Sequence, residues 1–152
     1  MAGEAERIVL QLKYAFDGEA WHGPSVLELL ADVNAAQAAM RPIHGAHTIW
    51  ELVLHIAAWK KAVARRLSGD RAELSEEENW PAIDDPSEAA WQQTLNVLKD
   101  SHRELLAAIA RLDERRLDES IVEGMSSVYV TVHGVIQHDL YHAGQIAILK
   151  KA

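Results

Sequence analysis

The sequence predicts an all-α protein: a four-helix bundle with a long crossover connection and short extra helices. Helix-forming residues dominate the 152-residue chain, and apolar residues recur at helical spacing in four long segments. Strand-like alternation of apolar and polar residues is almost absent. Between two of the segments lies a long acidic stretch, which is typical of a crossover on the surface of a bundle. The length is that of one domain, so we expect residues 1–152 to form a single domain.

The first long helix is expected over residues 4–16, where apolar residues form one helical stripe. Glycine and proline residues then interrupt the pattern. Ser25 and Glu28 have the spacing of a capping box, in which each side chain bonds a free backbone N–H at the helix start. This box predicts a short helix through Leu30, and a further short turn is expected over residues 34–40 before the next proline.

The second long helix has the clearest start signal. Thr48 and Glu51 form a T-x-x-E capping box, and the apolar periodicity that follows continues to Ser68 and Gly69. Glycine tolerates the left-handed conformation that often ends a helix, so the helix is expected to stop there. Residues 70–84 are acidic and are expected to form a long surface loop with room for a single helical turn.

The third long helix is expected to begin at the sequence "DPSE". Asp85 is suited to cap it, Pro86 to occupy its first position, and Glu88 to complete a capping box. A run of β-branched residues within 126–131 predicts a short extended segment after this helix. The fourth long helix is expected over residues 131–150.

Composition and charge exclude several classes of protein. The formal net charge is −8 and the pI is near 5.4, so the surface repels phosphate backbones and no nucleic-acid partner is expected. The chain has no cysteine, which excludes a disulfide scaffold and a protein-borne thiol nucleophile. Apolar runs fall short of the roughly 18 residues that a membrane span needs. The N-terminus lacks the basic-then-apolar order of a signal peptide, and we expect a cytoplasmic protein.

The sequence "IQHDLYHAGQ" at residues 136–145 holds two histidines four positions apart. Residues at this spacing are neighbours on a helix, with Cβ atoms roughly 5–6 Å apart. His138 and His142 can therefore converge on one ion, at metal–nitrogen distances of about 2.0–2.1 Å for zinc. The pair alone is equally compatible with two histidines on an ordinary helix.

His55 lies in the second turn of the second long helix, within the apolar segment "ELVLHIAAW". A buried imidazole without a partner is costly, so this side chain needs one. One interpretation is a core histidine bonded to a carbonyl or a carboxylate. The other is a third ligand, because facing helices of a bundle build metal sites between them. Three imidazoles leave an open coordination position, which is typical of a catalytic site.

Asp139 makes the local pattern H-D-x-x-H, which resembles the H-E-x-x-H motif of zinc proteases. Its side chain projects roughly 100° around the helix from His138, away from the ligand face. The acid is also one methylene shorter than the glutamate of that motif. We therefore expect Asp139 to support a metal ligand from outside the coordination sphere, or to take part in helix packing, rather than to act as a general base.

Three further residues are candidates for the surroundings of the site. Gln145 falls on the ligand face, where it can orient a ligand or a bound water or serve as a satisfied polar core residue. Trp59 follows His55 by one turn and is the candidate for an apolar wall of the pocket. Tyr141 has a hydroxyl suited to donate to a bound anion, although it can instead pack at an interface.

Two blocks of the sequence resemble those of the DinB-like superfamily, which is related to the bacillithiol and mycothiol S-transferases. They are "GAHTIWELVLHIAAWKKAV" and, near the C-terminus, "HGVIQHDLYHAGQIAILKK", and the likeness extends upstream to "WHGPSVLELLADVNAAQAAMRP". The resemblance implies a four-helix bundle that binds a divalent metal, usually zinc or nickel, through His55, His138 and His142. It also implies a homodimer, whose interface exposed tryptophans would help to form.

The resemblance further implies a metal-dependent enzyme acting on a small-molecule substrate, a thiol S-transferase that adds a low-molecular-weight thiol to an electrophile. A thiol coordinated to a metal ion is deprotonated, and the absence of cysteine fits a sulfur that arrives with the cosubstrate. Two alternatives stay open. One is metal-assisted hydrolysis with a bound water as nucleophile. The other is a non-catalytic, stress-related metal-binding protein.

Overall fold

The computed structural model describes residues 3–152, and the all-α fold expected from the sequence is confirmed. Four long helices make the bundle: α1 (Glu4–Asp17), α4 (Ile49–Leu67), α6 (Glu88–Ala110) and α7 (Val128–Leu149). Short helices occupy the connections: α2 (Val26–Leu30), α3 (Ala35–Ala39), α5 (Glu76–Asn79) and the 3-10 helix η1 (Glu114–Arg116). None of the helices within the described residues combines the length and the apolar character that crossing a membrane requires.

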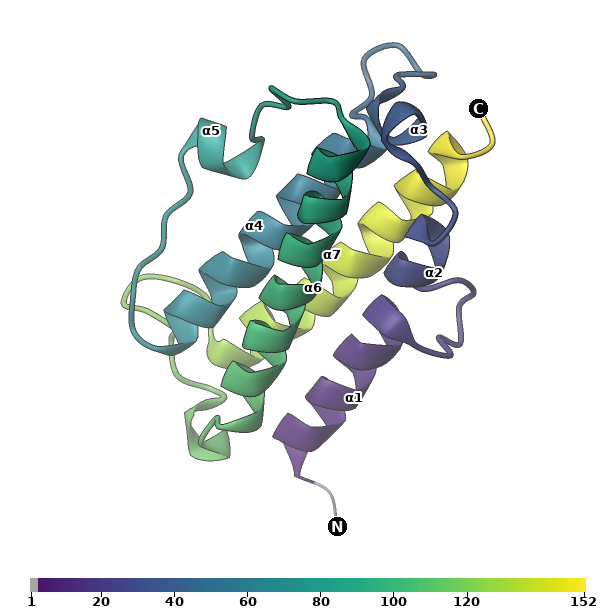
Figure 1. The fold of residues 1–152 in the computed structure, drawn as a ribbon. Coiled ribbons are helices and arrows are strands. Elements are labelled where there is room, and N and C mark those ends of the chain that lie inside the picture. Colours follow the sequence, from purple (N-terminus) through teal and green to yellow (C-terminus); the bar gives the residue numbers. More distant parts are fainter. Residues whose placement is uncertain (1–2) are drawn as a thin grey trace.

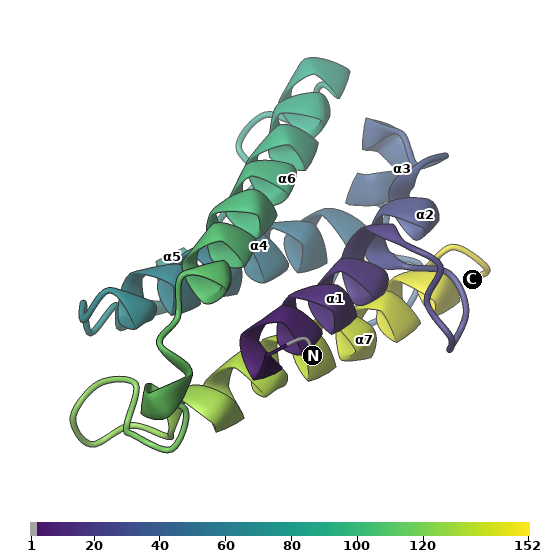
Figure 2. The same ribbon diagram turned by 90° about the horizontal axis from the view of Figure 1, so that it is seen from below.

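The four long helices pack in a ring. Helix α4 contacts α6 and α7, and α1 contacts the same two helices. Helices α4 and α6 run in one direction, whereas α1 and α7 run in the other (Figure 1). Figure 2 shows α1 lying alongside α7. Because α4 and α6 are parallel, the chain between them must return along the bundle, and this crossover carries α5 back to the side of α4.

Local capping signals place several helix ends where the sequence predicts them. The backbone N–H of Glu51 donates to the Thr48 hydroxyl over 3.1 Å, and the Thr48 N–H donates to the Glu51 carboxylate over 2.8 Å. Gly69 follows the end of α4 with a φ of 94°, the left-handed conformation that favours glycine. The short helices α2 and α3 also form at their predicted positions.

The start of α6 differs from the prediction. Ser87, not Asp85, caps this helix, and its hydroxyl accepts a hydrogen bond from the N–H of Ala90. Asp85 instead accepts from the N–H of Ser87, and the proline precedes the cap. Glu88 leaves its own helix start and accepts from the N–H of Ala35 at the start of α3, over 2.8 Å. Glu88 therefore bonds a residue 53 positions away instead of completing the capping box predicted at the start of α6.

The start of α7 also differs, because the extended segment expected over 126–131 is mostly helical. Ser127 caps α7, with its hydroxyl accepting from the N–H of Val130, and the helix begins at Val128. Extended pairing is limited to an isolated bridge between Ser127 and Ser120. Val128 is buried in the core, and this tertiary packing outweighs the preference of β-branched residues for strands.

A polar layer divides the core of the bundle into two apolar clusters. One cluster lies toward α2 and α3 and the other toward the N-terminal end of α1. Lys60 on α4, His102 on α6 and Asp139 on α7 are buried, and each stands on its helix between residues of the two clusters. The polar layer is thus at mid-height of the bundle, level with the segment of α7 that carries His138 and His142.

Two tryptophans lie in the core of the bundle and one lies on its surface. Trp50 and Trp91 are fully buried, and their indole N–H groups donate to the Thr94 hydroxyl and the Val33 carbonyl. Both therefore help to form the core of the bundle. Trp21 is fully exposed.

Candidate metal centre

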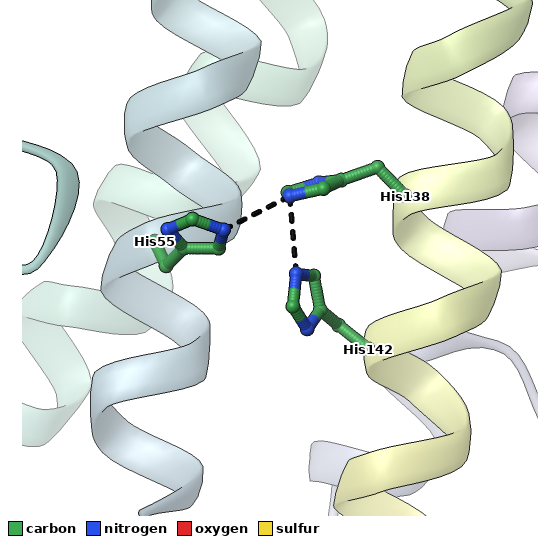
Figure 3. A group of neighbouring side chains, drawn as sticks. All are labelled: His55, His138 and His142. Atoms are coloured by element: carbon green, nitrogen blue, oxygen red, sulfur yellow. Dashed lines mark hydrogen bonds between the residues drawn. The ribbon is translucent and has the colours of Figure 1, made fainter. Parts of the chain in front are cut away.

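Three imidazoles meet between α4 and α7. His55 extends from α4 toward His138 and His142, which lie one above the other on α7 (Figure 3). The Nε2 atom of His138 lies 3.0 Å from the Nε2 atom of His55 and 3.0 Å from that of His142. One nitrogen from each ring lies within 4.8 Å of the other two. The helical pair and the distant histidine thus face one point.

The donor set fits a divalent metal ion. Two ligand nitrogens on a tetrahedral zinc are roughly 3.3 Å apart if each bond is about 2.0–2.1 Å long, close to the spacing observed. His55 and His142 are only 7% and 5% exposed, so the rings are withdrawn from water. Three protein ligands leave a fourth position for a water or a substrate.

Burial keeps the three rings in the protonation state that a metal needs. It lowers the pKa of His138 to about 3, with the neighbouring His142 and His55 adding to the effect. Burial also lowers the pKa values of His55 and His142 below the usual value, against the opposing effects of their hydrogen bonds to Asn79 and Gln145. A neutral imidazole presents a free lone pair, which is the form that binds metal ions.

The crossover connection orients His55. The His55 Nδ1 lies 3.0 Å from the Asn79 carbonyl oxygen and donates to it, which leaves Nε2 as the free nitrogen. The indole of Trp80 stacks on His55 with ring centroids 3.9 Å apart, and on His47 with centroids 3.6 Å apart. Two imidazoles cannot both stack on the same face of the Trp80 indole at such distances, so the indole lies between His55 and His47. The connection is thereby a wall of the site rather than a free loop.

Gln145 orients the second histidine of the helical pair. Its Oε1 lies 2.5 Å from the Nδ1 of His142 and accepts a hydrogen bond from it, so that the Nε2 of His142 points to the cluster. The Nδ1 of His138 is buried and has no hydrogen-bond partner within residues 3–152. The third ring is thus oriented without a hydrogen bond at its Nδ1.

Trp59 lies beside two of the histidines. Its ring meets those of His55 and His138 nearly edge-on, with centroids 6.4 and 6.3 Å away. Its indole N–H donates to the Asn79 side-chain oxygen over 2.8 Å. One residue of the crossover, Asn79, therefore positions both His55 and Trp59.

The single helical turn expected within residues 70–84 is α5, but the sequence reasoning took the stretch for a surface loop and missed the contacts of Asn79 and Trp80 with the site. A signal was available. Ser75 and Glu78 form a capping box that starts α5 within this acidic stretch. An aromatic residue that directly follows such a turn in a charged segment indicates that the segment packs against the body of the protein.

Asp139 points away from the three imidazoles, as the helical spacing predicts. It is 0% exposed and accepts a hydrogen bond from the equally buried Lys60 ammonium over 2.6 Å. Burial lowers the pKa of Lys60 and raises that of Asp139, and the contact between the two groups opposes both shifts. The sequence reasoning missed Lys60, because a lysine is rarely so fully buried.

Tyr141 lies at the surface, and its ring centroid is 5.2 Å from that of His142. It therefore borders the site from outside.

Comparison with known proteins assigns the chain to a family. A family model described as the DinB superfamily matches residues 21–146, which include all three histidines and the crossover. No significant match was found among curated proteins or among solved structures. The match covers most of the chain, and it includes the three histidines that the fold brings together. The chain belongs to the DinB superfamily.

Proposed function

We propose that the protein is a divalent-metal-dependent enzyme, a transferase that adds a low-molecular-weight thiol to an electrophilic carbon. His55, His138 and His142 are the proposed ligands, with zinc or nickel as the ion. The observation that carries the proposal is the convergence of three imidazole Nε2 atoms from two facing helices, two on buried rings and one on the half-buried ring of His138. Membership of the DinB superfamily and the absence of cysteine support it.

A divalent ion supplies one piece of chemistry when bound here: it holds a thiol in its deprotonated, nucleophilic form. In the proposed reaction a sulfur–carbon bond forms while the bond from that carbon to its leaving group breaks. The leaving group departs with the bonding electron pair, and the thiol proton passes to water. No protein nucleophile is required, in keeping with a chain that has no cysteine.

The side chains around the cluster perform the supporting work. The Asn79 carbonyl and the Gln145 amide fix the ring orientations of His55 and His142 before a ligand arrives. Trp80 and Trp59 cover two sides of the histidines and exclude water from them. Such exclusion strengthens charge interactions with a bound thiolate.

Metal content tests the ligand assignment. Elemental analysis of the purified protein is expected to find about one divalent ion per chain. A His55→Ala/His142→Ala variant is expected to lose it, whereas His133→Ala, a change elsewhere on α7, is expected to retain it. An unchanged metal content in the double variant would refute the assignment.

An activity assay tests the reaction. Zinc-loaded and nickel-loaded protein is incubated with several low-molecular-weight thiols and 1-chloro-2,4-dinitrobenzene as the electrophile. Thiol consumption is expected in the wild type and in His133→Ala, and it is expected to vanish in His138→Ala. Hydrolysis of esters or amides without any thiol would instead identify a hydrolase. Inactivity in both assays together with tight metal binding would identify a binding protein.

We also propose, from the family resemblance, that the protein is a homodimer. Sedimentation equilibrium is expected to give twice the 16.9 kDa mass of one chain. A mass of one chain at micromolar concentration would reject it.

A further inference from the structure

A groove opens between α4 and α7 directly beside His138. Its volume is about 250 Å³, smaller than most drug-binding pockets, and it suits a compact ligand. Its walls are mostly apolar and end at a single charged group. The lining residues are Trp59, Val63, Arg66, Thr131, Gly134, Val135 and His138.

Arg66 is the charged group, and its positive charge is not neutralised by a neighbour. The adjacent Arg65 pairs with Asp70 and the nearby Arg71 with Glu73, but no carboxylate within residues 3–152 pairs with Arg66. The surface as a whole is acidic, with a net charge of −8, so a lone cation beside the histidines is a local exception.

The Arg66 guanidinium is held in place while most of its donors stay free. Its Nε and Nη2 donate to the carbonyls of Arg71 and Ala72, over 3.2 and 3.1 Å. Its central carbon lies 5.4 Å from the centroid of the Trp59 ring. A guanidinium has five N–H groups, so three remain for a ligand, in the planar arrangement that matches a carboxylate.

We propose that this groove binds a small organic carboxylate. The carboxylate lies against Arg66, and the apolar stem lies along Trp59 and Val135 with its far end at His138. This rests on the proposed function in one respect, since it makes an organic anion one of the two substrates of the transfer. The binding itself needs no metal.

Gly134 offers a means of closing the groove without disturbing the fold. It lies one turn before His138 on the same face of α7, and a Cβ added to it would meet no atom within 4 Å. Gly144 is a matched control, since it is also helical and equally open but does not line the groove. Replacing either glycine also removes the cost that glycine imposes on a helix interior.

The test uses the full, metal-free protein labelled with ¹⁵N and titrated with hexanoate or, as the uncharged match, hexanamide. The indole N–H signal of Trp59, assigned by its loss in Trp59→Phe, is expected to shift saturably with hexanoate. Hexanamide is expected to bind about tenfold more weakly, because a charge-assisted hydrogen bond is lost. Thermal unfolding of each variant checks that it is folded.

The variants separate the groove from general charge effects. Arg66→Gln is expected to weaken hexanoate binding about tenfold and to remove the preference over hexanamide, whereas Arg65→Gln is expected to change neither. Gly134→Leu is expected to abolish binding, and Gly144→Leu to leave it intact. Equal affinity for the two ligands, or equal effects of Arg65→Gln and Arg66→Gln, would overturn the proposal.

Failure of this proposal and failure of the proposed function give different results. Thiol transfer without an Arg66-dependent shift rejects the carboxylate groove alone. Hexanoate binding that depends on Arg66, in a protein that transfers no thiol, rejects the transferase and leaves the groove as a ligand site.

Discussion

His102 shows how the fold controls the charge of a single residue. It is buried, its ring stacks on Phe16 with centroids 3.8 Å apart, and its Nδ1 has no hydrogen-bond partner within residues 3–152. Burial, reinforced by the charges of Lys60 and Lys13, lowers the pKa of His102 to about 3 from the usual 6.5. Folding therefore requires this imidazole to be neutral.

This requirement predicts a loss of stability in acid. As the pH falls from 6.5 toward 3, the unfolded chain binds a proton at residue 102 that the folded protein does not, so the free energy of unfolding decreases. The contribution is up to about 1.4 kcal/mol per pH unit. His102→Phe keeps a ring against Phe16 and removes this proton. Guanidinium unfolding in EDTA between pH 4 and 7 is expected to show a shallower decline for the variant.

The other buried histidines contribute equally to the pH dependence of stability in the wild type and in His102→Phe, so their effects cancel in this comparison. Parallel stability–pH curves for the wild type and His102→Phe would rule out the assigned titration.

At the scale of the helices, two polar contacts join α4 and α7: a cluster of histidines and a buried ion pair. On one side His55 meets the helical pair, and on the other Lys60 bonds Asp139. Because His138 and Asp139 are adjacent in sequence, one turn of α7 carries both links. The buried pair therefore constrains the rotation of α7 that directs His138 to the cluster.

Breaking that pair is expected to cost far more than replacing it. Lys60→Met or Asp139→Leu alone leaves an uncompensated buried charge and is expected to destabilise the fold by about 3–5 kcal/mol. The Lys60→Met/Asp139→Leu double variant is expected to recover most of that loss, because the layer becomes apolar. Urea unfolding of the metal-free proteins measures both effects.

The exposed pair of Arg103 and Asp100 on α6 supplies the control, since removing either partner there is expected to change stability by less than about 1 kcal/mol. If the single variants of Lys60 and Asp139 lost as little stability as these surface variants, a charged pair in the core would be contradicted.

Long-range caps also act at this scale. The start of α1 has no side-chain cap of its own, and the N–H of Ala5 donates instead to Glu114, over 3.0 Å. Glu88 adds a distant acceptor at the start of α3, which also has its own cap in Asn34. Both carboxylates come from segments distant in sequence, so these two hydrogen bonds form only when the bundle forms.

At the scale of the whole molecule, the cluster joins two helices that 60 residues of chain separate, α4 and α7. An ion bound by ligands from both helices stabilises only the folded protein, by about 4.1 kcal/mol at a free concentration 1,000 times the Kd. For a chain of this length, that corresponds to an increase in Tm on the order of 10 °C.

Calorimetry of zinc-loaded and EDTA-treated protein measures this shift. We expect one cooperative transition in each case, because we propose that the chain folds as one domain. The His55→Ala/His142→Ala variant is expected to show the same Tm with and without zinc. Two separate transitions would reject the single domain, and a zinc-dependent Tm in the double variant would reject the ligand set.

Local signals in the sequence were sufficient for the all-α class, the four long helices, the capping box of Thr48 and Glu51, and the common face of His138 and His142. These depend on residues three or four positions apart, where the geometry of a helix determines which side chains meet. The same reasoning failed at Glu88 and Val128, because a partner or a core distant in sequence outweighed the local preference.

The sequence by itself thus determined the elements, and through its three histidines it made a shared site a testable hypothesis. Only the tertiary structure decided that His55 reaches the other two rings, that Asn79 and Trp80 support it, and that Lys60 neutralises Asp139. The physical reason is the range of the contacts. A helix turn repeats every 3.6 residues, whereas His55 lies 83 residues from His138 in the sequence and meets it only when the crossover and the bundle pack.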